Sequence, residues 1–362
     1  GSPVNAVNNV SFEIYPDQTL GLVGESGSGK TTLALAILRY LPQEGLICEG
    51  EVHFRGQNVL DLSRQEMRRL WGTRISFVPQ DARSSLNPSL PIGSQVKELL
   101  TYKAGLSDNA AQQRAVELFQ QVQLGDVERV LSAYPHQISG GMLQRVLTAM
   151  AISTEPELLI LDEPTSSLDV TTQAEILDLY RDLLDENPHT AVMYITHNLG
   201  VVAQLSDRIA VMYAGELVEL AHTRDIYQSS YHPYTTALID SVPRLGENKS
   251  QVKLRPIQGR IPPLGDRPSG CVFRTRCPLA IEICQEYPPL YQAERGHHAR
   301  CHRWDEIMRQ EVDPHQPAPD HAPPLVDRLA TAQDPLLDIE ELEVYFARQR
   351  SLIDLLSGDS SP

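Results

Sequence analysis

The sequence predicts an α/β fold whose core is a largely parallel sheet. Short apolar segments of strand length alternate with longer segments of helical periodicity, which is the order that such folds require. One apolar segment, 19–23, leads into a glycine-rich loop and then into an apolar helical segment, 32–38. Another, 157–162, is an uninterrupted apolar run that ends in carboxylates, as is typical of a strand buried on both faces.

The loop between 19–23 and 32–38 matches the phosphate-binding pattern G-x-x-x-x-G-K-[ST] at every fixed position. Its glycines allow backbone N–H groups to close on phosphate oxygens, and the helix that follows adds the positive end of its dipole. Lys30 is expected on the β- and γ-phosphates, and the Thr31 hydroxyl on Mg²⁺. A chance match in a glycine-rich turn is the alternative, and the flanking strand and helix argue against it. The residues expected to hold the nucleotide are Gly24, Ser26, Gly27, Gly29, Lys30, Thr31 and Thr32.

The segments before the middle of the chain add further elements. Residues 4–15 alternate apolar and polar side chains, as a half-buried strand does. A hairpin strand is expected over 51–56 and a short helix over 63–70. The segment 74–79 is the next expected strand, and Gln80 stands at its end.

The pattern changes over about 81–155, where apolar residues recur at helical spacing without a strong strand signal. This stretch is expected to be a helical insertion. A helix over 171–186, a buried strand over 189–196 and a hairpin over 208–220 then complete the α/β core.

Two carboxylates end the apolar run at 157–162. Asp162 can hold Mg²⁺, directly or through water, and Glu163 can polarise an attacking water. Alone, the pair would be equally consistent with two solvated acids at the end of a strand. Together with the phosphate-binding loop it predicts hydrolysis of the nucleotide as well as binding.

With these motifs in order, residues 4–225 resemble the ATP-binding cassette (ABC) family. Gln80 resembles the Q-loop glutamine of that family, and His197 resembles its switch histidine. Ser167-Leu168-Asp169 resembles its D-loop. Ser139, Gly140 and Gly141, with residues 142–145, resemble the family's signature loop. Together with the preceding residue the loop reads Ile-Ser-Gly-Gly-Met, whereas the commoner sequence is Leu-Ser-Gly-Gly-Gln. The serine and both glycines are therefore kept.

The resemblance implies the fold of a P-loop NTPase of the ABC type, with a mixed sheet core and a helical subdomain over about 81–155 of a domain 1–230. It implies catalytic roles for Glu163, His197 and Gln80, with Gln80 also a ligand of Mg²⁺ beside Thr31 and Asp162. It places Ser139, Gly140, Gly141 and Asp169 at the ATP of a facing domain, because in the family two domains close head to tail over two nucleotides. ATP then favours the closed dimer, and hydrolysis removes that preference.

The next module narrows the resemblance. The segment 231–238, Tyr-His-Pro-Tyr-Thr-Thr-Ala-Leu, and the segment 242–245 resemble the C-terminal extension of peptide-importer ATPases, which we expect over 231–310. That group serves dipeptides, oligopeptides, glutathione and nickel complexes. Selectivity among these substrates lies in a binding protein and a permease, so the sequence does not reveal which substrate is carried.

The extension contains four of the five cysteines, namely Cys271, Cys277, Cys284 and Cys301. Disulfides are disfavoured in a cytosolic protein, and structural zinc usually shows tighter C-x-x-C pairs. Four thiolates without such pairs favour a [4Fe–4S] cluster, which the resemblance also implies. Zn²⁺ and free thiols are the alternatives, and His297, His298 and His302 keep mixed ligation open. A structural role is a safer expectation than a redox role.

Composition limits the partners. The formal net charge of −16 argues against a nucleic-acid binder, and no apolar run approaches the roughly 20 residues of a membrane span. The resemblance to peptide-importer ATPases implies a peripheral protein on the cytoplasmic face of the plasma (inner) membrane, with two separate permease subunits and, indirectly, an extracytoplasmic substrate-binding protein. The coupling surface is expected over about 81–96. The alternative is a soluble non-transport ABC ATPase acting on nucleic acid or ribosomes, which the charge and the short helical insertion disfavour.

The tail adds a last expectation. After a linker over 311–334, the segment 335–346 resembles the first strand of a cassette, in which Tyr345 or Phe346 would stack on adenine, so 335–362 is expected to begin a second ABC domain. The matching strand of the first domain would precede Gly1. We therefore expect a window from a longer protein with two cassettes in tandem. A rearranged order, in which the tail completes this same domain, and an ordinary amphipathic tail are the alternatives.

Overall fold

The structure, a computed structural model, describes residues 5–41, 47, 49–242, 257–293 and 296–315. The chain divides into two units, Gly1–Pro319 and Asp320–Pro362. All of the described residues belong to the first unit. The expected start of a second cassette at 335–362, with Tyr345 and Phe346, and most of the expected linker lie outside the described residues.

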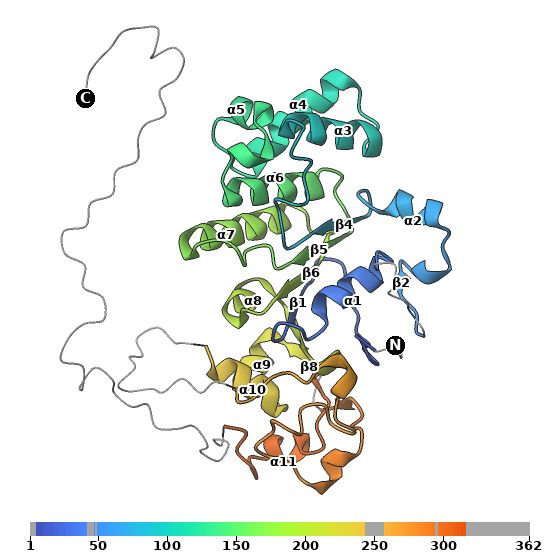
Figure 1. Cartoon of the computed structure of the whole chain (residues 1–362), viewed down its shortest axis with the longest axis vertical. Helices are drawn as coiled ribbons and strands as arrows, with labels where there is room; N and C mark the ends of the chain where they lie inside the picture. The colour runs from blue at the N-terminus through green and yellow to red at the C-terminus, as the bar shows by residue number, and fades with distance from the viewer. Residues whose placement is uncertain (1–4, 42–46, 48, 243–256, 294–295, 316–362) are drawn as a thin grey trace, which may run out of the picture. The chain divides into compact units, whose positions relative to one another are not determined.

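A single central sheet organises the first unit (Figure 1). The strands are β1 (Thr19–Val23), β2 (His53–Phe54), β3 (Gln57–Asn58), β4 (Ile75–Val78), β5 (Leu158–Asp162), β6 (Ala191–Thr196), β7 (Arg208–Tyr213), β8 (Glu216–His222), β9 (Tyr291–Gln292) and β10 (His298–Ala299). Eight of them form the central sheet in the order β4-β5-β6-β1-β7-β8-β10-β9, and β2 pairs with β3 separately. From β4 to β7 the neighbours are parallel, whereas β8, β10 and β9 are added antiparallel. The sheet is therefore mixed, as expected.

Helices cover both faces of this sheet. They are α1 (Lys30–Ile37), α2 (Arg64–Leu70), α3 (Ile92–Lys103), α4 (Asp108–Gln121), α5 (Val127–Ser132), α6 (Gly140–Ile152), α7 (Val170–Glu186), α8 (Leu199–Leu205), α9 (Thr223–Gln228), α10 (Pro233–Asp240) and α11 (Trp304–Met308). Successive residues of a strand point to opposite faces, and β6 illustrates the result. Its Val192 and Tyr194 join the apolar core formed with α6 and α7, while Met193 and Ile195 join the core formed with α1. Because both faces are buried, β6 is an uninterrupted apolar run.

The expected helical insertion consists of α3, α4, α5 and α6, which lie together at one end of the unit (Figure 1). Its own apolar core includes Leu100, Phe119 and Val130, all fully buried. That core continues into Leu159 and Leu161 of β5, so the insertion is fixed on the sheet beside the strand that carries the acidic pair.

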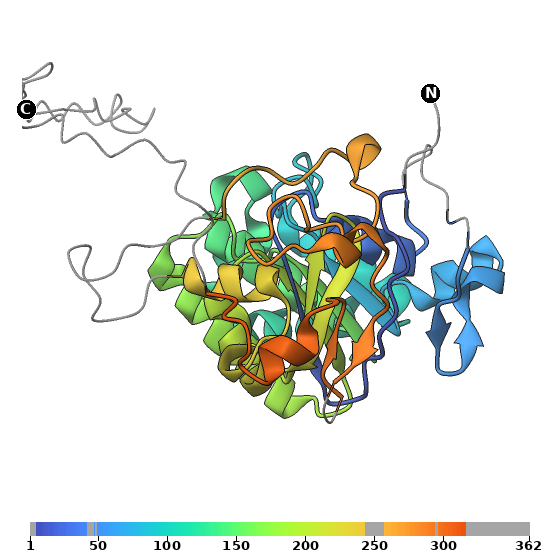
Figure 2. The ribbon, with the colours of Figure 1, turned by 90° about the horizontal axis from the view of Figure 1, so that it is seen from below.

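The prediction of a half-buried strand over 4–15 is wrong for the described residues 5–15, which form no strand. Their apolar side chains, such as Val10 and Phe12, do pack on the core beside α1, which accounts for the alternating pattern. Within the described part of the chain, however, this segment has no partner strand, and the backbone N–H of Asn8 donates to the Gly215 carbonyl at 2.8 Å. The expected hairpin is observed as the short pair β2–β3, which lies with α2 beside the main body (Figure 2).

The extension is continuous with the central sheet. Its strand β10 pairs with β8, with His298 opposite Leu220 and Ala299 opposite Glu219. Arg300, only 3% exposed, then fastens it by donating to the carbonyls of Leu217 (2.9 Å) and Asn9 (3.1 Å). The extension is thus built onto the edge of the sheet.

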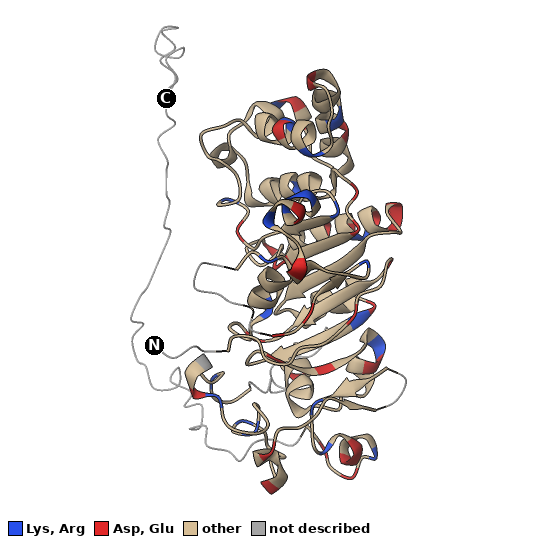
Figure 3. Ribbon diagram, turned by 90° about the vertical axis from the view of Figure 1, so that its right-hand side faces the viewer, with Lys and Arg blue, Asp and Glu red and all other residues tan. Residues whose placement is uncertain are grey.

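Charged residues of both signs are interspersed over the helices (Figure 3). Among the helices that the structure describes, none is long and apolar enough to cross a membrane.

Candidate ATPase site

The phosphate-binding loop connects β1 to α1, and two of its glycines are required by geometry. A Cβ atom at Gly24 would lie 2.1 Å from the Met212 carbonyl oxygen, a severe clash with backbone. Gly29 precedes α1 with φ of 100°, in the left-handed region that favours glycine. Ser26 is exposed and Thr32 is partly buried. The strand, loop and helix predicted from the sequence are all in place.

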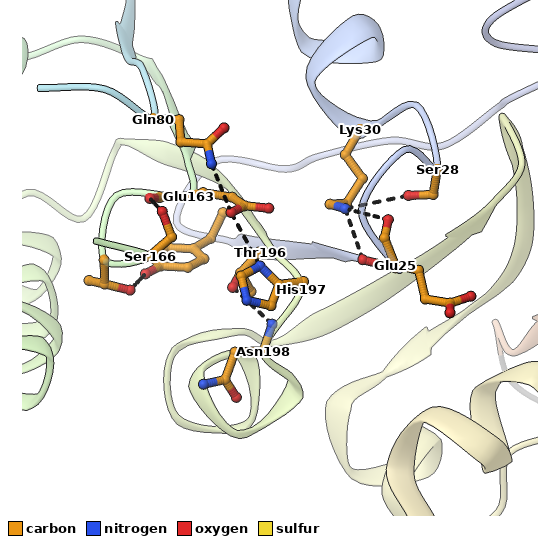
Figure 4. Close-up of polar contacts among 12 residues, drawn as sticks. Glu25, Ser28, Lys30, Gln80, Glu163, Ser166, Thr196, His197 and Asn198 are labelled. Atoms are coloured by element: carbon orange, nitrogen blue, oxygen red, sulfur yellow. Dashed lines mark hydrogen bonds and ion pairs between the residues drawn. The ribbon is translucent and has the colours of Figure 1, made fainter. Parts of the chain in front are cut away.

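Lys30, in the first turn of α1, is enclosed by this loop. Its side chain is almost fully buried, and Nζ donates to the carbonyls of Gly24 (2.8 Å) and Glu25 (3.1 Å) and to the Ser28 hydroxyl (3.4 Å) (Figure 4). Burial lowers the pKa of this ammonium, while the nearby carboxylates of Glu163 and Asp162 oppose that change. The loop therefore holds a cation where phosphate oxygens are expected to bind.

Asp162, the last residue of β5, has an oxygen that fits a bound cation. The residue is 1% exposed, and its Oδ1 is buried without a hydrogen-bond partner. Burial raises the pKa of this carboxyl group, against a hydrogen bond from Thr31 and the charge of Lys30, which lower it. A buried carboxylate oxygen without a partner is costly unless a ligand satisfies it. Asp162 and Thr31 therefore fit the Mg²⁺ of a bound nucleotide.

Glu163 is the point on which two other predicted catalytic side chains converge. Its Oε2 accepts a hydrogen bond from Nε2 of Gln80 at 3.2 Å and lies 3.2 Å from Nδ1 of His197 (Figure 4). Gln80 follows β4, Glu163 follows β5 and His197 follows β6. These three strands are neighbours in the parallel sheet, so their carboxyl ends bring the side chains to one edge. The fold thus assembles an acid, an amide and an imidazole beside the phosphate-binding loop.

The signature and D-loop residues make their contacts at the starts of α6 and α7, away from the phosphate-binding loop. Ser139 caps α6 by accepting from the backbone N–H of Met142 at 3.3 Å, and a Cβ atom at Gly141 would lie 2.7 Å from a methyl group of Thr172. Asp169 caps α7 by accepting from the N–H of Thr172 at 3.0 Å, which helps to hold its pKa below the usual range. Gly140 is the first residue of α6. Within the described part of the chain, no hydrogen bond of these residues reaches the phosphate-binding loop.

The four cysteines of the extension line one pocket, together with His232, Phe273, His302 and Arg303. They are free thiols, and burial raises the pKa of Cys271 to about 11 and that of Cys277 to about 12. Burial also raises the pKa of Cys301. In the part of the chain that the structure describes, no three His, Cys, Asp or Glu residues are grouped so that they could hold a metal ion. The structure therefore gives no support to the expected [4Fe–4S] cluster or to the alternative zinc site, and the cluster stays a prediction.

Of the three histidines that left mixed ligation open, only one lines the cysteine pocket. His302 lines the cysteine pocket, whereas His297 is committed to Glu219, with Nε2 and Oε1 2.7 Å apart. His298 lies in β10 and its Nδ1 is 3.1 Å from the Gly296 carbonyl.

Sequence reasoning missed the residues that support the phosphate-binding loop from behind. The carboxylate of Glu25 is paired with Arg276, and its backbone N–H donates to the Tyr234 hydroxyl at 2.9 Å. Ser28 accepts from Lys30. Glu25 and Ser28 occupy variable positions of the loop pattern, and no local signal in the sequence connects them to residues in the extension.

The sheet, the helical insertion and this site together define an ATPase of the ABC class. The family model described as "ABC transporter" matches residues 7–166. A second, described as "Oligopeptide/dipeptide transporter, C-terminal region", matches residues 218–284. The chain belongs to the family of peptide ABC transporter ATP-binding proteins.

Curated relatives carry this family assignment. A probable peptide ABC transporter ATP-binding protein of Sinorhizobium fredii is 45% identical over 309 residues, which are 85% of this chain and 92% of the relative. A dipeptide transport ATP-binding protein of Bacillus subtilis is 41% identical over 313 residues, 86% of this chain and 92% of the relative. A solved dimeric ATP-binding cassette, bound to ADP and Pi in a post-hydrolysis state, is 30% identical with a TM-score of 0.53; the match covers 60% of this chain and 91% of that one.

Proposed function

We propose that this chain is the ATP-hydrolysing subunit that powers import of peptides or related small solutes through separate permease subunits. The observation that carries the proposal is the match of residues 218–284 to the peptide-transporter C-terminal region, which follows the match of residues 7–166 to the ABC transporter model. The names of the relatives, which include peptide and dipeptide transport proteins, favour the same substrate class.

In the proposed reaction, Lys30 and the amides of its loop would bind the β- and γ-phosphates, and Thr31 and Asp162 would hold Mg²⁺, which would supply neutralising charge at the phosphates. We propose Gln80 as a further ligand of this Mg²⁺. Glu163 orients and polarises the attacking water as general base. Gln80 and His197 position the Glu163 carboxylate, and His197 is exposed enough to turn toward the γ-phosphate.

A second cassette completes the site. Ser139 contacts Met142 of its own helix, and Gly140 and Gly141 face Leu168 and Thr172 at the start of α7, yet a helix start with free N–H groups is an anion site. We place these three residues, with Asp169, at the γ-phosphate of a facing domain in a head-to-tail dimer. The dimeric state of the similar solved cassette is consistent with this arrangement.

Import of a solute across a membrane requires further subunits beside the ATPase. Two integral-membrane permease subunits would form the path, with residues 81–96 as their docking surface, and an extracytoplasmic binding protein would deliver the substrate. The chain would then lie on the cytoplasmic face of the plasma (inner) membrane. A non-transport ABC ATPase on nucleic acid or ribosomes is the alternative, and the net charge of −16 disfavours it.

We also propose that Cys271, Cys277, Cys284 and Cys301 hold a [4Fe–4S] cluster, because all four line one pocket. Ligands of a single zinc ion lie about 2.3 Å from one point, and the described residues offer no such group. A cluster distributes its four sulfur ligands over four irons. Iron, acid-labile sulfide and zinc should be measured on anaerobically purified protein. About four irons and four sulfides per chain would support the cluster, whereas zinc without sulfide or free thiols alone would refute it.

The domain limits remain proposals: an ATPase domain 1–230, the extension 231–310, a linker 311–334 and, from 335, the start of a second cassette. The tandem arrangement rests on the sequence of 335–346, and the matches to relatives lend it no support. The full-length coding sequence would test it directly.

The decisive experiment compares stimulation of ATP hydrolysis. The chain should be assembled with the permease subunits and binding protein of its transporter, and assayed with peptides, with DNA and with ribosomes. We expect peptide and binding protein to stimulate hydrolysis. Stimulation by DNA or ribosomes, without an effect of peptide, would favour the alternative.

A further inference from the structure

The cysteine-bearing loop of the extension is joined to the phosphate-binding loop by a partly buried ion pair. Arg276 directly precedes Cys277, and Glu25 directly follows Gly24. The guanidinium donates from Nη1 to Oε2 of Glu25 at 2.7 Å and from Nη2 to Oε1 at 3.1 Å. The Arg276 side chain is only 4% exposed, so this bidentate pair is shielded from solvent on the arginine side.

Arg276 is held in place by its own surroundings. Its Nε donates to the Gln258 carbonyl at 2.7 Å, Nη2 to the Ile257 carbonyl at 3.3 Å, and Nη1 to the Tyr213 hydroxyl at 3.3 Å. The guanidinium carbon also lies 5.6 Å from the centre of the Tyr213 ring. A planar group fixed on three sides presents one orientation to Glu25, which a lysine could not reproduce.

A second contact fixes the backbone of Glu25. Its N–H donates to the hydroxyl of Tyr234, a fully buried residue of α10. The Tyr234 ring packs against those of Tyr213 (4.7 Å between centroids) and Phe273 (5.3 Å). The Glu25 carbonyl accepts from Lys30. The extension thus holds the backbone N–H and the side chain of Glu25, and Lys30 holds its carbonyl.

We propose that Arg276 and Tyr234 are positioning residues that set the conformation of the phosphate-binding loop, so that nucleotide affinity depends on the extension. The inference rests on nucleotide binding by this loop, as proposed above. Such a loop binds phosphate through several backbone N–H groups that must point inward together, and a loop held in that conformation loses less entropy on binding. The coupling is reciprocal, so bound nucleotide stabilises the extension loop 271–284 in turn.

The test is titration of the full chain with MgADP by calorimetry, which avoids turnover. We expect Arg276→Met to raise the Kd at least tenfold, Tyr234→Phe at least threefold, and Arg276→Lys by an intermediate factor. Arg303→Met is the matched control. Arg303 lines the same cysteine pocket and pairs with Glu306, but its described contacts do not reach the phosphate-binding loop. Its Kd should stay within twofold of the unaltered chain.

Two further measurements distinguish positioning of the phosphate-binding loop by Arg276 from a purely structural role of this residue. Glu25→Gln combined with Arg276→Met should weaken binding less than the product of the two single effects, because both remove one interaction. MgADP should slow hydrogen exchange over 271–284 in the unaltered chain and not in Arg276→Met. If Arg276→Met does not fold, Tyr234→Phe, which keeps the ring and loses only the hydroxyl, carries the test.

The inference is overturned if Arg276→Met and Tyr234→Phe bind MgADP as the Arg303→Met control does, or if exchange over 271–284 ignores the nucleotide. Failure of the unaltered chain to bind MgADP is a different result, because it would overturn the ATPase assignment itself.

Discussion

Replacement of Glu163 by glutamine separates nucleotide binding from hydrolysis. Glutamine has nearly the size of glutamate and keeps an oxygen that can accept the bonds from Gln80 and His197, now 3.2 Å away. It cannot take a proton from water. Since Glu163 makes no hydrogen bond to the phosphate-binding loop, the Kd for MgATP should change less than about threefold, or roughly 0.7 kcal/mol.

The expected loss of rate follows from the role of a general base. Such a base contributes about 10²–10⁴ to the rate, so the barrier should rise by roughly 2.7–5.4 kcal/mol. The loss should fall on kcat, because the carboxylate acts in the transition state and adds little to ground-state binding. ATP should therefore remain bound, and a closed dimer should accumulate when the partner cassette is supplied.

Phosphate release at saturating MgATP measures this rate, and equilibrium binding of labelled ATP measures affinity. Glu186→Gln is the matched control, because Glu186 also accepts a glutamine amide, from Gln121 at 2.8 Å, on the exposed end of α7. It should hydrolyse ATP like the unaltered chain. Turnover by Glu163→Gln within threefold of this control would refute the assignment of Glu163 as base.

Three further outcomes are expected. Lys30→Ala should weaken MgATP binding by at least 100-fold, because a buried ammonium that contacts phosphate is lost; unchanged affinity would rule out the phosphate-binding assignment. Arg300→Met should lower the free energy of unfolding by about 3–5 kcal/mol, because buried backbone carbonyls lose their donors, and a thermal melt unlike that of the exposed Arg309→Met would show it; equal melting would contradict the anchoring role. Burial lowers the pKa of His232 from its ordinary value of 6.5 to about 3. Between these two pH values the unfolded chain binds a proton at this residue and the folded chain does not. The free energy of unfolding should therefore fall by about 1.4 kcal/mol per pH unit below pH 6.5, or about 2 kcal/mol at pH 5. His232→Asn keeps an acceptor for the Tyr234 N–H and should lack this part of the acid dependence in urea unfolding; an unchanged slope would contradict it.

The sequence predicts the features that are local in the chain. The phosphate-binding loop, the acidic pair Asp162–Glu163 and the helical insertion all have signals within a few residues of themselves, and the structure has the corresponding elements. The convergence of Gln80 and His197 on Glu163 follows once their strands are placed side by side in a parallel sheet.

Features that depend on distant pairing were not predictable in this way. The strand expected over 4–15 has the right alternation and no partner strand among the described residues, so its apolar side chains pack without forming a ladder. The contact of Arg276 with Glu25 joins residues 251 positions apart. The sequence around neither residue indicates the other as its partner. They come together only because the extension packs against β7 and β8.

We propose that hydrolysis at this site drives import, and a transport measurement tests this proposal. The complete transporter should be reconstituted in proteoliposomes with its permease subunits and binding protein, and uptake of a labelled dipeptide and a labelled pentapeptide should be measured with MgATP on the cassette side. We expect uptake of at least one peptide, which requires ATP and is abolished by Glu163→Gln. Uptake that continues in that variant, or ATP hydrolysis without uptake of either peptide, would contradict it.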